Sequence, residues 1–169
     1  QNITDIIPSL QPVPGRMNTL SKDDTHALIV IDYAHTPDAL QQVLIALKQH
    51  NNSGRIWCIF GCGGNRDKGK RPQMGHIAEQ FADQVIITDD NPRFENAEQI
   101  SNEILMGMNT KPLVIHVRKE AIAHAITHAN KKDIILIAGK GHENQQEIQG
   151  KFISCNDKEI ANSVLGVAL

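Results

Sequence analysis

No apolar run in this 169-residue sequence approaches the roughly 20 residues that a membrane-spanning helix requires. The formal net charge is -2, so the sequence also lacks the basic excess that is typical of proteins bound to phosphate backbones. Neither a membrane nor a nucleic acid is therefore expected as a main partner.

Cysteine is scarce, and because there are three cysteines, they cannot all pair in disulfide bonds. Cys58 and Cys62 have C-x3-C spacing, but Cys58 lies inside the apolar run IWCIF and no second pair completes a zinc site. The N-terminus has neither the basic n-region nor the apolar h-region of a signal peptide. We expect a protein of the reducing cytoplasm, with no metal site in this chain.

The composition is that of a soluble globular protein, with 40% apolar and 21% charged residues, and the length fits one domain. Residues 1–20 contain Pro8, Pro12, Pro14 and Gly15 but no sustained periodicity, which indicates a connecting segment. We therefore expect residues 21–169 to form the domain itself.

Apolar, β-branched runs alternate with stretches of helical periodicity along this domain. The runs are expected to be strands, at residues 27–32, 55–60, 84–89, 112–117, 133–139 and 151–154. The helical stretches lie at about 37–50, 72–82, 96–108, 119–130 and 156–165. This alternation predicts a three-layer, Rossmann-like α/β domain with a mostly parallel, about six-stranded sheet.

Open α/β sheets bind ligands beyond the carboxyl ends of their strands. Four segments rich in glycine, proline and charge follow predicted strands: DYAHTP, GCGGNRDKGKR, DDNPR and GKGHE, at residues 32–37, 61–71, 89–93 and 139–143. We expect them to converge on one binding site at that edge.

The segment from Gly64 to Lys70 fits the pattern GxxxxGK of a phosphate-binding loop. Arg71, however, stands where the Mg²⁺-binding Ser or Thr would be. The basic residues Arg66, Lys68, Lys70 and Arg71 still favour an anionic ligand group. A small P-loop NTPase or kinase, or a solvated basic loop, is the alternative.

The DDNPR segment combines carboxylates, an amide and a guanidinium. Pro92 restricts the backbone around it, so Asn91 and Arg93 are expected to be held in one orientation. Arginine suits a carboxylate and aspartate an ammonium, so the segment favours a zwitterionic ligand, although a surface turn would have the same composition. In GKGHE, Gly139 permits close approach and Glu143 could bind an ammonium.

Two histidines follow strands near this site. His142 could be a general base, but a lone histidine is more often structural. Asp32 is a candidate acceptor for ribose hydroxyls or an amine, and His35 is close enough in sequence to share its site.

Taken together, the segments PGRM (14–17), DYAHTPDAL (32–40), FGCGGNRDKGKRP (60–72), TDDNPR (88–93) and AGKGHE (138–143) resemble the C-terminal domain of the Mur ligases, in the branch that adds diaminopimelate. Their order and spacing span nearly the whole chain. The resemblance implies a cytoplasmic ligase of peptidoglycan synthesis with two further domains that are absent from this sequence. Residues 1–20 would then be the end of the central ATPase domain and the linker.

The resemblance further implies that ATP and Mg²⁺, bound mainly by the central domain, activate the acceptor UDP-N-acetylmuramoyl-dipeptide as an acyl phosphate. The amine of meso-diaminopimelate then attacks, and this chain, inactive alone, supplies that amino acid. A stand-alone amino-acid-binding module is the other alternative.

Position by position, the resemblance assigns the diaminopimelate contacts to Arg66, Asp90, Asn91, Pro92, Arg93, Gly139 and Glu143. The two arginines, with Asn91, would hold the carboxylate of the distal amino-acid centre, and Glu143 and the Gly139 carbonyl its ammonium. Arg16 and Asp32 would contact the nucleotide, and His35 would lie near the reacting groups as the candidate catalytic residue.

Overall fold

The computed structural model describes residues 17–20, 26–51 and 53–166. The strands are β1 (Asn18–Leu20), β2 (Leu28–Asp32), β3 (Ile56–Phe60), β4 (Gln84–Ile87), β5 (Leu113–Val114), β6 (Ile134–Ala138), β7 (Gln145–Ile148) and β8 (Lys151–Ser154). The helices are α1 (Pro37–His50), α2 (Lys70–Phe81), α3 (Ala97–Leu105), α4 (Arg118–His128) and α5 (Asp157–Val164).

The described strands form a six-stranded sheet in the order β1-β2-β6-β3-β4-β5. Strand β1 pairs antiparallel with β2, and every other pairing in this sheet is parallel. The predicted fold class, a three-layer α/β domain with a mostly parallel sheet, is confirmed.

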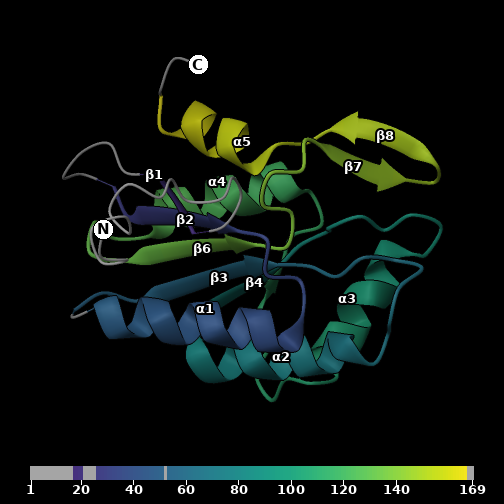
Figure 1. Cartoon of the computed structure of the whole chain (residues 1–169), viewed down its shortest axis with the longest axis horizontal. Coiled ribbons are helices and arrows are strands. Elements are labelled where there is room, and N and C mark those ends of the chain that lie inside the picture. Colours follow the sequence, from purple (N-terminus) through teal and green to yellow (C-terminus); the bar gives the residue numbers. More distant parts are fainter. Residues whose placement is uncertain (1–16, 21–25, 52, 167–169) are drawn as a thin grey trace, which may run out of the picture.

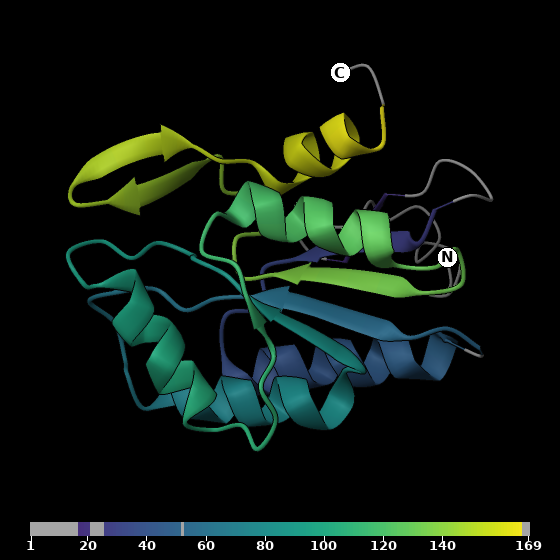
Figure 2. The ribbon, with the colours of Figure 1, turned by 180° about the vertical axis from the view of Figure 1, so that it is seen from behind.

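Helices cover both faces of the sheet, as Figures 1 and 2 show. Strands β2, β3 and β6 are almost completely buried, and their alternate residues point to opposite faces. On one face Val30, Cys58 and Leu136 pack with α1, α2 and α3. On the other face Ile31 and Ile137 pack with α4 and α5. Two apolar layers therefore hold the sheet, and its loops remain free to carry polar groups.

Local signals account for where several helices begin. Thr36 precedes Pro37, which occupies the first turn of α1, and the Thr36 side chain accepts a hydrogen bond from the Ala39 N–H. Asn96 and Asn156 cap α3 and α5 in the same way. The ends of α1 coincide with the prediction, and the other helices begin or end within three residues of theirs.

The sixth strand of the sheet differs from the expected one. Residues 18–20, expected in the connecting segment, form β1 at the edge of the sheet. The predicted strand at 151–154 exists as β8, but it pairs antiparallel with β7 in a separate hairpin. In Figure 1 this hairpin projects beyond the carboxyl ends of the parallel strands. The segment 151–154 has no buried residue, so burial does not hold it in the main sheet.

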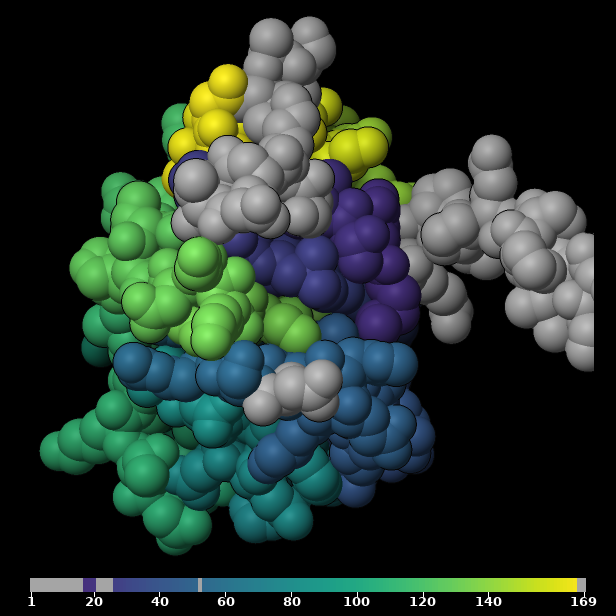
Figure 3. Space-filling model, turned by 90° about the vertical axis from the view of Figure 1, so that its left-hand side faces the viewer, coloured from purple at the N-terminus to yellow at the C-terminus, as the bar shows by residue number. Residues whose placement is uncertain are grey.

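A buried carboxylate links neighbouring strands at the opposite end of the sheet, where the parallel strands begin. Figure 3 shows the molecule from this end. Asp133 accepts hydrogen bonds from the Arg55 N–H at 2.8 Å, the Asn130 N–H at 3.0 Å and the Trp57 Nε1–H at 3.0 Å. Burial alone would raise the pKa of Asp133, but these hydrogen bonds outweigh burial and lower it. Asp133 thereby joins the starts of β3 and β6.

The helices that the structure describes are all too short or too polar to cross a membrane.

We expect Asp133→Asn to lower the free energy of unfolding by about 1–3 kcal/mol, because the amide presents one acceptor to three donors. Since the folded pKa of Asp133 is lowered, its contribution is present above the unfolded pKa, near 3.9, and is lost as pH falls through the folded pKa. Urea denaturation at pH 7 and pH 3 measures both effects. The exposed Asp38, changed to Asn, is the control, and equal stability of Asp133→Asn and wild type at pH 7 would contradict the expectation.

Candidate functional site

A cleft of about 510 Å³ lies at the carboxyl ends of the parallel strands, where the sequence predicted the site. All four predicted segments contribute to it. The lining residues are Tyr33, His35, Thr36, Gly61, Gly63, Arg66, Asp67, Lys70, Asp90, Asn91, Arg93, Gly139 and Glu143.

The loops 61–71 and 89–93 are hydrogen-bonded to each other along one wall of this cleft. The Gly64 N–H donates to the Asn91 carbonyl at 2.8 Å, and Arg93 Nη1 donates to the Gly64 carbonyl at 2.9 Å. A Cβ at Gly64 would lie 1.9 Å from the Pro92 carbonyl oxygen, so only glycine permits this approach. Pro92 is buried at this junction and does not line the cleft, so it shapes the wall.

The basic residues of the loop 61–71 do not share one role. Arg71 is fully buried and pairs with Glu95 at 2.9 Å and with Glu103 at 2.7 Å, so the expectation that it faces an anionic ligand is wrong. Lys68 also pairs with Glu95, at 3.4 Å. Arg66 and Lys70 line the cleft.

The backbone of the loop 61–71 is not arranged to bind phosphate. The N–H groups of Gly64 and Asn65 donate to the Asn91 carbonyl and the Glu95 carboxylate, and the Gly69 N–H donates to Asp67 at 2.8 Å. A P-loop leaves such groups free for its ligand. The P-loop alternative is therefore unsupported by the geometry.

Arg93 is fixed through its backbone as well as its side chain. It adopts φ 53°, a left-handed conformation that few residues other than glycine adopt, and its N–H donates to the Glu147 carbonyl at 3.0 Å. Its Nε lies 3.1 Å from Glu147 Oε2. Strand β7 therefore supports Arg93 from outside the sheet, and Nη2 has no hydrogen-bond partner among the described residues.

Asn91 and Glu143 meet at the boundary of the cleft, where Asn91 Nδ2 donates to Glu143 Oε2 at 3.1 Å. Both residues, with Arg93, also line a second hollow of about 440 Å³, which Phe152 and Glu147 of the hairpin line as well. The pair therefore lines both polar spaces.

Asp90 lies almost completely buried beside Gly139, where a Cβ would approach Asp90 Oδ2 to 2.8 Å. Burial raises the pKa of Asp90, and the nearby cations Arg118 and Lys140 partly oppose that rise. An ammonium placed here would complete the charge balance of this carboxylate.

His35 lines the cleft, although Asp32, whose site it was expected to share, does not. Its Nδ1 lies 2.8 Å from the Tyr33 carbonyl, its own carbonyl accepts from Lys70 Nζ at 2.7 Å, and its ring packs edge-on against Tyr33. His142 also packs against Tyr33, with ring centroids 5.7 Å apart. His142 thus contacts a residue that lines the cleft.

Asp32 does not line the cleft. Its Oδ1 accepts from the Ala34 N–H at 2.7 Å and its Oδ2 from the Met17 N–H at 2.8 Å. Asp32 therefore holds the residue that directly follows Arg16 in the sequence. Arg16 itself lies outside the described residues.

Asp89 turns away from the cleft and pairs with His116 at 2.8 Å. The thiols of Cys58 and Cys62 are buried, and burial raises the pKa of each to about 12. Across residues 17–20, 26–51 and 53–166, no group of three or more histidine, cysteine or acidic side chains could hold a metal ion.

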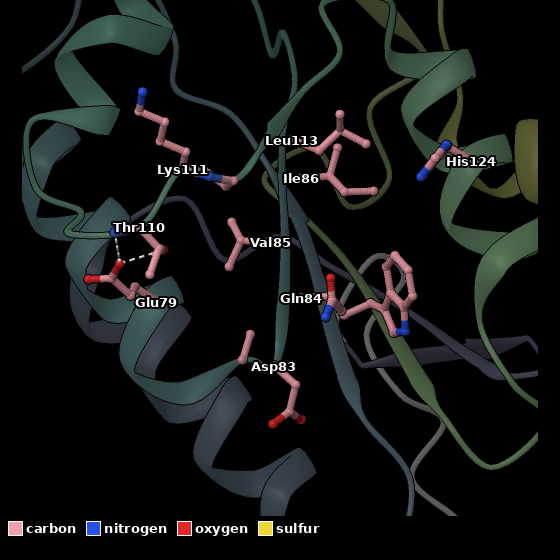
Figure 4. A pocket seen from close by; sticks show the side chains of 12 residues that line it. Glu79, Asp83, Gln84, Val85, Ile86, Thr110, Lys111, Leu113 and His124 are labelled. Atoms are coloured by element: carbon pink, nitrogen blue, oxygen red, sulfur yellow. Dashed lines mark hydrogen bonds between the residues drawn. The ribbon is translucent and has the colours of Figure 1, made fainter.

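A separate pocket of about 350 Å³ opens beside β4 and β5, away from the cleft (Figure 4). Glu79 lies on its rim and accepts hydrogen bonds from the backbone and side chain of Asn109 and Thr110, which lower its pKa to about 2. Glu79 therefore stabilises the turn after α3, whereas Asp83 in the same pocket accepts from the Ile56 N–H at the start of β3.

Sequence reasoning gave no role to Tyr33, Lys140 or Glu147, which support the cleft. Tyr33 and Lys140 lie inside motifs that were singled out, and their positions directly after buried strands were the available signal. Glu147 belongs to β7, which no sequence pattern predicted.

We expect Arg71→Met to lower the free energy of unfolding by about 1–3 kcal/mol, because charge-assisted hydrogen bonds to Glu95 and Glu103 are lost. Arg71 holds the pKa of Glu95 down at about 2, so this pKa should rise towards its ordinary value. NMR titration of Glu95 and chemical denaturation check both. Lys68→Met, which removes an exposed partner of the same carboxylate, should change stability by less than about 1 kcal/mol; an equal effect of the two variants would contradict the expectation.

Known proteins share this fold and these motifs. A family model described as "Mur ligase, glutamate ligase domain" matches residues 15–141. A protein from Neisseria meningitidis serogroup A, named UDP-N-acetylmuramoyl-L-alanyl-D-glutamate--2,6-diaminopimelate ligase, is 47% identical over 165 residues, which are 97% of this chain and 33% of that protein. The protein of the same name from Xylella fastidiosa is 49% identical over 166 residues, 96% of this chain and 33% of its own length.

A solved structure bearing that name superposes with a TM-score of 0.84 at 46% identity, and covers 96% of this chain and 33% of that one. The chain thus spans about a third of the length of the curated relatives it matches. Because the family model covers well over half of the chain, and the relatives align along nearly all of it, the chain belongs to the Mur ligase family.

Proposed function

We propose that this chain is the C-terminal, amino-acid-binding domain of an ATP-dependent ligase that adds meso-2,6-diaminopimelate to UDP-N-acetylmuramoyl-L-alanyl-D-glutamate. The observation that carries the proposal is the convergence, in one cleft of about 510 Å³, of Arg66, Asp90, Asn91, Arg93, Gly139 and Glu143. The relatives named for this reaction, 47% and 49% identical, support the same substrate.

The cleft offers opposite charges for the two ends of an amino-acid centre. The guanidinium groups of Arg66 and Arg93 would bind the carboxylate in planar, bidentate fashion, with Asn91 donating beside them. Glu143 and the Gly139 carbonyl would accept from the ammonium, with the buried Asp90 adding negative charge beneath.

This arrangement should reject lysine. Lysine has an ammonium but no carboxylate at its distal end, so binding it would leave the Arg66 guanidinium without a counter-charge and Arg93 Nη2 without an acceptor, although Glu147 still pairs with Arg93 Nε. Discrimination of this kind rests on an unmet charge and is stronger than discrimination by shape alone.

The remaining parts of the reaction would fall to the other domains and to the residues of this chain that meet them. Residues 1–20 would include the end of the central domain and the linker, with β1 fastening the linker's last residues to this domain. Arg16 and Asp32 would contact the nucleotide, and His35 would lie near the reacting groups, when the domains close.

ATP with Mg²⁺ would supply the activation of the acceptor carboxylate as an acyl phosphate. The loop 61–71 does not resemble a triphosphate site, since the N–H groups of Gly64, Asn65 and Gly69 already bind protein acceptors and Arg71 replaces the Mg²⁺-binding hydroxyl. The chain alone is therefore expected to have no ligase activity, and its part in the reaction is to bind and orient the incoming amino acid.

Titration of the isotope-labelled chain with meso-diaminopimelate should give saturable NMR shifts at Arg66, Asn91, Arg93 and Glu143. L-Lysine should give none. A dissociation constant of about 1 mM is expected, because domain closure normally completes such a site and the chain alone cannot close. Arg93→Met should abolish the response, whereas Arg55→Met, at the far end of the sheet, should retain it. Equal responses to both amino acids would contradict the assignment of the substrate.

Gly139→Ala should abolish diaminopimelate binding, because its Cβ would displace the Asp90 carboxylate. Gly166→Ala is a matched control, since Gly166 also has a positive φ, 70°, and has nothing within 4 Å of a new Cβ. Gly166→Ala should lose about 1–2 kcal/mol of stability from backbone strain. Gly139→Ala should lose more, because its φ of 111° lies outside the left-handed helical region and its Cβ meets Asp90. Calorimetric titration separates the two, and wild-type affinity in Gly139→Ala would argue against the placement of the ammonium.

A further inference from the structure

Lys140 is a fully buried lysine that the proposed binding contacts do not include. It lies between Gly139 and Gly141 after β6, and none of its side chain is exposed. Its Nζ donates to Asn91 Oδ1 at 3.1 Å, to Glu143 Oε2 at 3.0 Å and to the Gln145 carbonyl at 2.6 Å. An ammonium has three N–H donors, so each of them has an acceptor.

The contacts of Lys140 determine which way the Asn91 amide faces. Asn91 Oδ1 accepts from Lys140 Nζ and also from the Glu147 N–H at 3.0 Å. Both partners are donors, so the side-chain atom of Asn91 that faces them must be the amide oxygen. The amide nitrogen is then the only polar group that Asn91 can turn towards a ligand, and Asn91 serves as a donor.

The Lys140 ammonium also makes the two carboxylate oxygens of Glu143 different from each other. Oε2 accepts from Lys140 Nζ and from Asn91 Nδ2. Oε1 has no hydrogen-bond partner among the described residues, and Glu143 lines the cleft. One carboxylate oxygen is therefore committed to the protein and the other is left to accept from a ligand.

The burial of Lys140 requires that all of its hydrogen bonds be kept. An unpaired charge in the interior costs several kcal/mol, so a lysine with no exposed surface must keep its acceptors in place. Lys140 and its partners Asn91 and Glu143 consequently form a rigid unit beneath the cleft, because moving any one of them breaks a hydrogen bond to the buried cation.

We propose that Lys140 is a positioning residue that sets the polarity of the amino-acid site. It commits Asn91 to donate to the ligand's carboxylate and Glu143 to accept from the ligand's ammonium, and thereby decides the orientation in which a zwitterionic centre binds. This inference rests on the proposed function for the identity of the ligand.

The test compares Lys140→Met with the wild type in the full-length protein that contains this chain. Methionine retains the length of the side chain and removes the ammonium. Two amino acids serve as probes: meso-diaminopimelate, and L-2-aminopimelate, which retains both carboxylates but lacks the distal amine. Lys158→Met, which removes an exposed lysine on α5, is the matched control.

In Lys140→Met, the KM for diaminopimelate should rise by about 10-fold or more, as expected for the loss of a charge-assisted hydrogen bond. The KM for L-2-aminopimelate should rise less, because this probe loses only the contribution of Asn91 to carboxylate binding, so the wild-type preference between the two probes should shrink towards one. The kcat should be nearly unchanged. Lys158→Met should behave as wild type in all three respects.

A merely structural lysine would give a different result. Both KM values would then rise by the same factor together with a loss of thermal stability, and that outcome would overturn the proposal. So would an unchanged preference in Lys140→Met. If the wild type responded to neither probe, the proposed function would fail first and this inference with it, which distinguishes the two failures.

The wild-type chain provides a second measurement that does not depend on the folding of the variant. The ¹⁵Nζ ammonium signal of Lys140 should be protected from exchange with water and should show a coupling across its hydrogen bond to the Glu143 carboxylate. On addition of diaminopimelate, the Asn91 side-chain N–H signals should shift while this coupling persists. A rapidly exchanging, uncoupled Lys140 ammonium would overturn the proposal.

Discussion

The buried guanidinium of Arg71 is the interaction on which the shape of the cleft depends. It joins helix α2, which carries it, to the Gly63 carbonyl in the first cleft loop, to Glu95 just after the second loop, and to Glu103 on α3. An arginine with no exposed surface is tolerated only when it is paired, and here two carboxylates that reach solvent share the task. Glu95 also accepts from the Asn65 N–H, so the same carboxylate joins the two loops.

The fold was predictable from the sequence because buried parallel strands are continuous apolar runs and the helices between them carry their own start signals. Thr36 and Pro37 set the beginning of α1, and its bounds coincide with the prediction. Which short segments join the main sheet as strands was less predictable. Segments 18–20 and 151–154 are both short and weakly patterned, and which of them joins the sheet depends on contacts with residues distant in sequence.

The candidate site was predictable to the level of segments, because ligand-binding loops follow the carboxyl ends of strands. The direction of each side chain was not. Arg66 and Arg71 look equivalent in the sequence, but Arg71 turns inward because Glu95 and Glu103, 24 and 32 residues away, are there to neutralise it. Lys140 is buried for a similar reason, since one of its acceptors, Asn91, comes from a distant segment and the other two, Glu143 and the Gln145 carbonyl, follow it closely in the sequence.

The hairpin of β7 and β8 supplies no residue to either apolar core of the described chain, although it holds Arg93 and Asn91 through Glu147. The part of the molecule that adjusts the binding groups is thus separate from the part that makes the domain stable. Mutations in the hairpin beyond Gln145 and Glu147 are therefore expected to leave both apolar cores intact. In evolutionary terms, the hairpin is where a change of amino-acid preference would disturb the stability of the fold least.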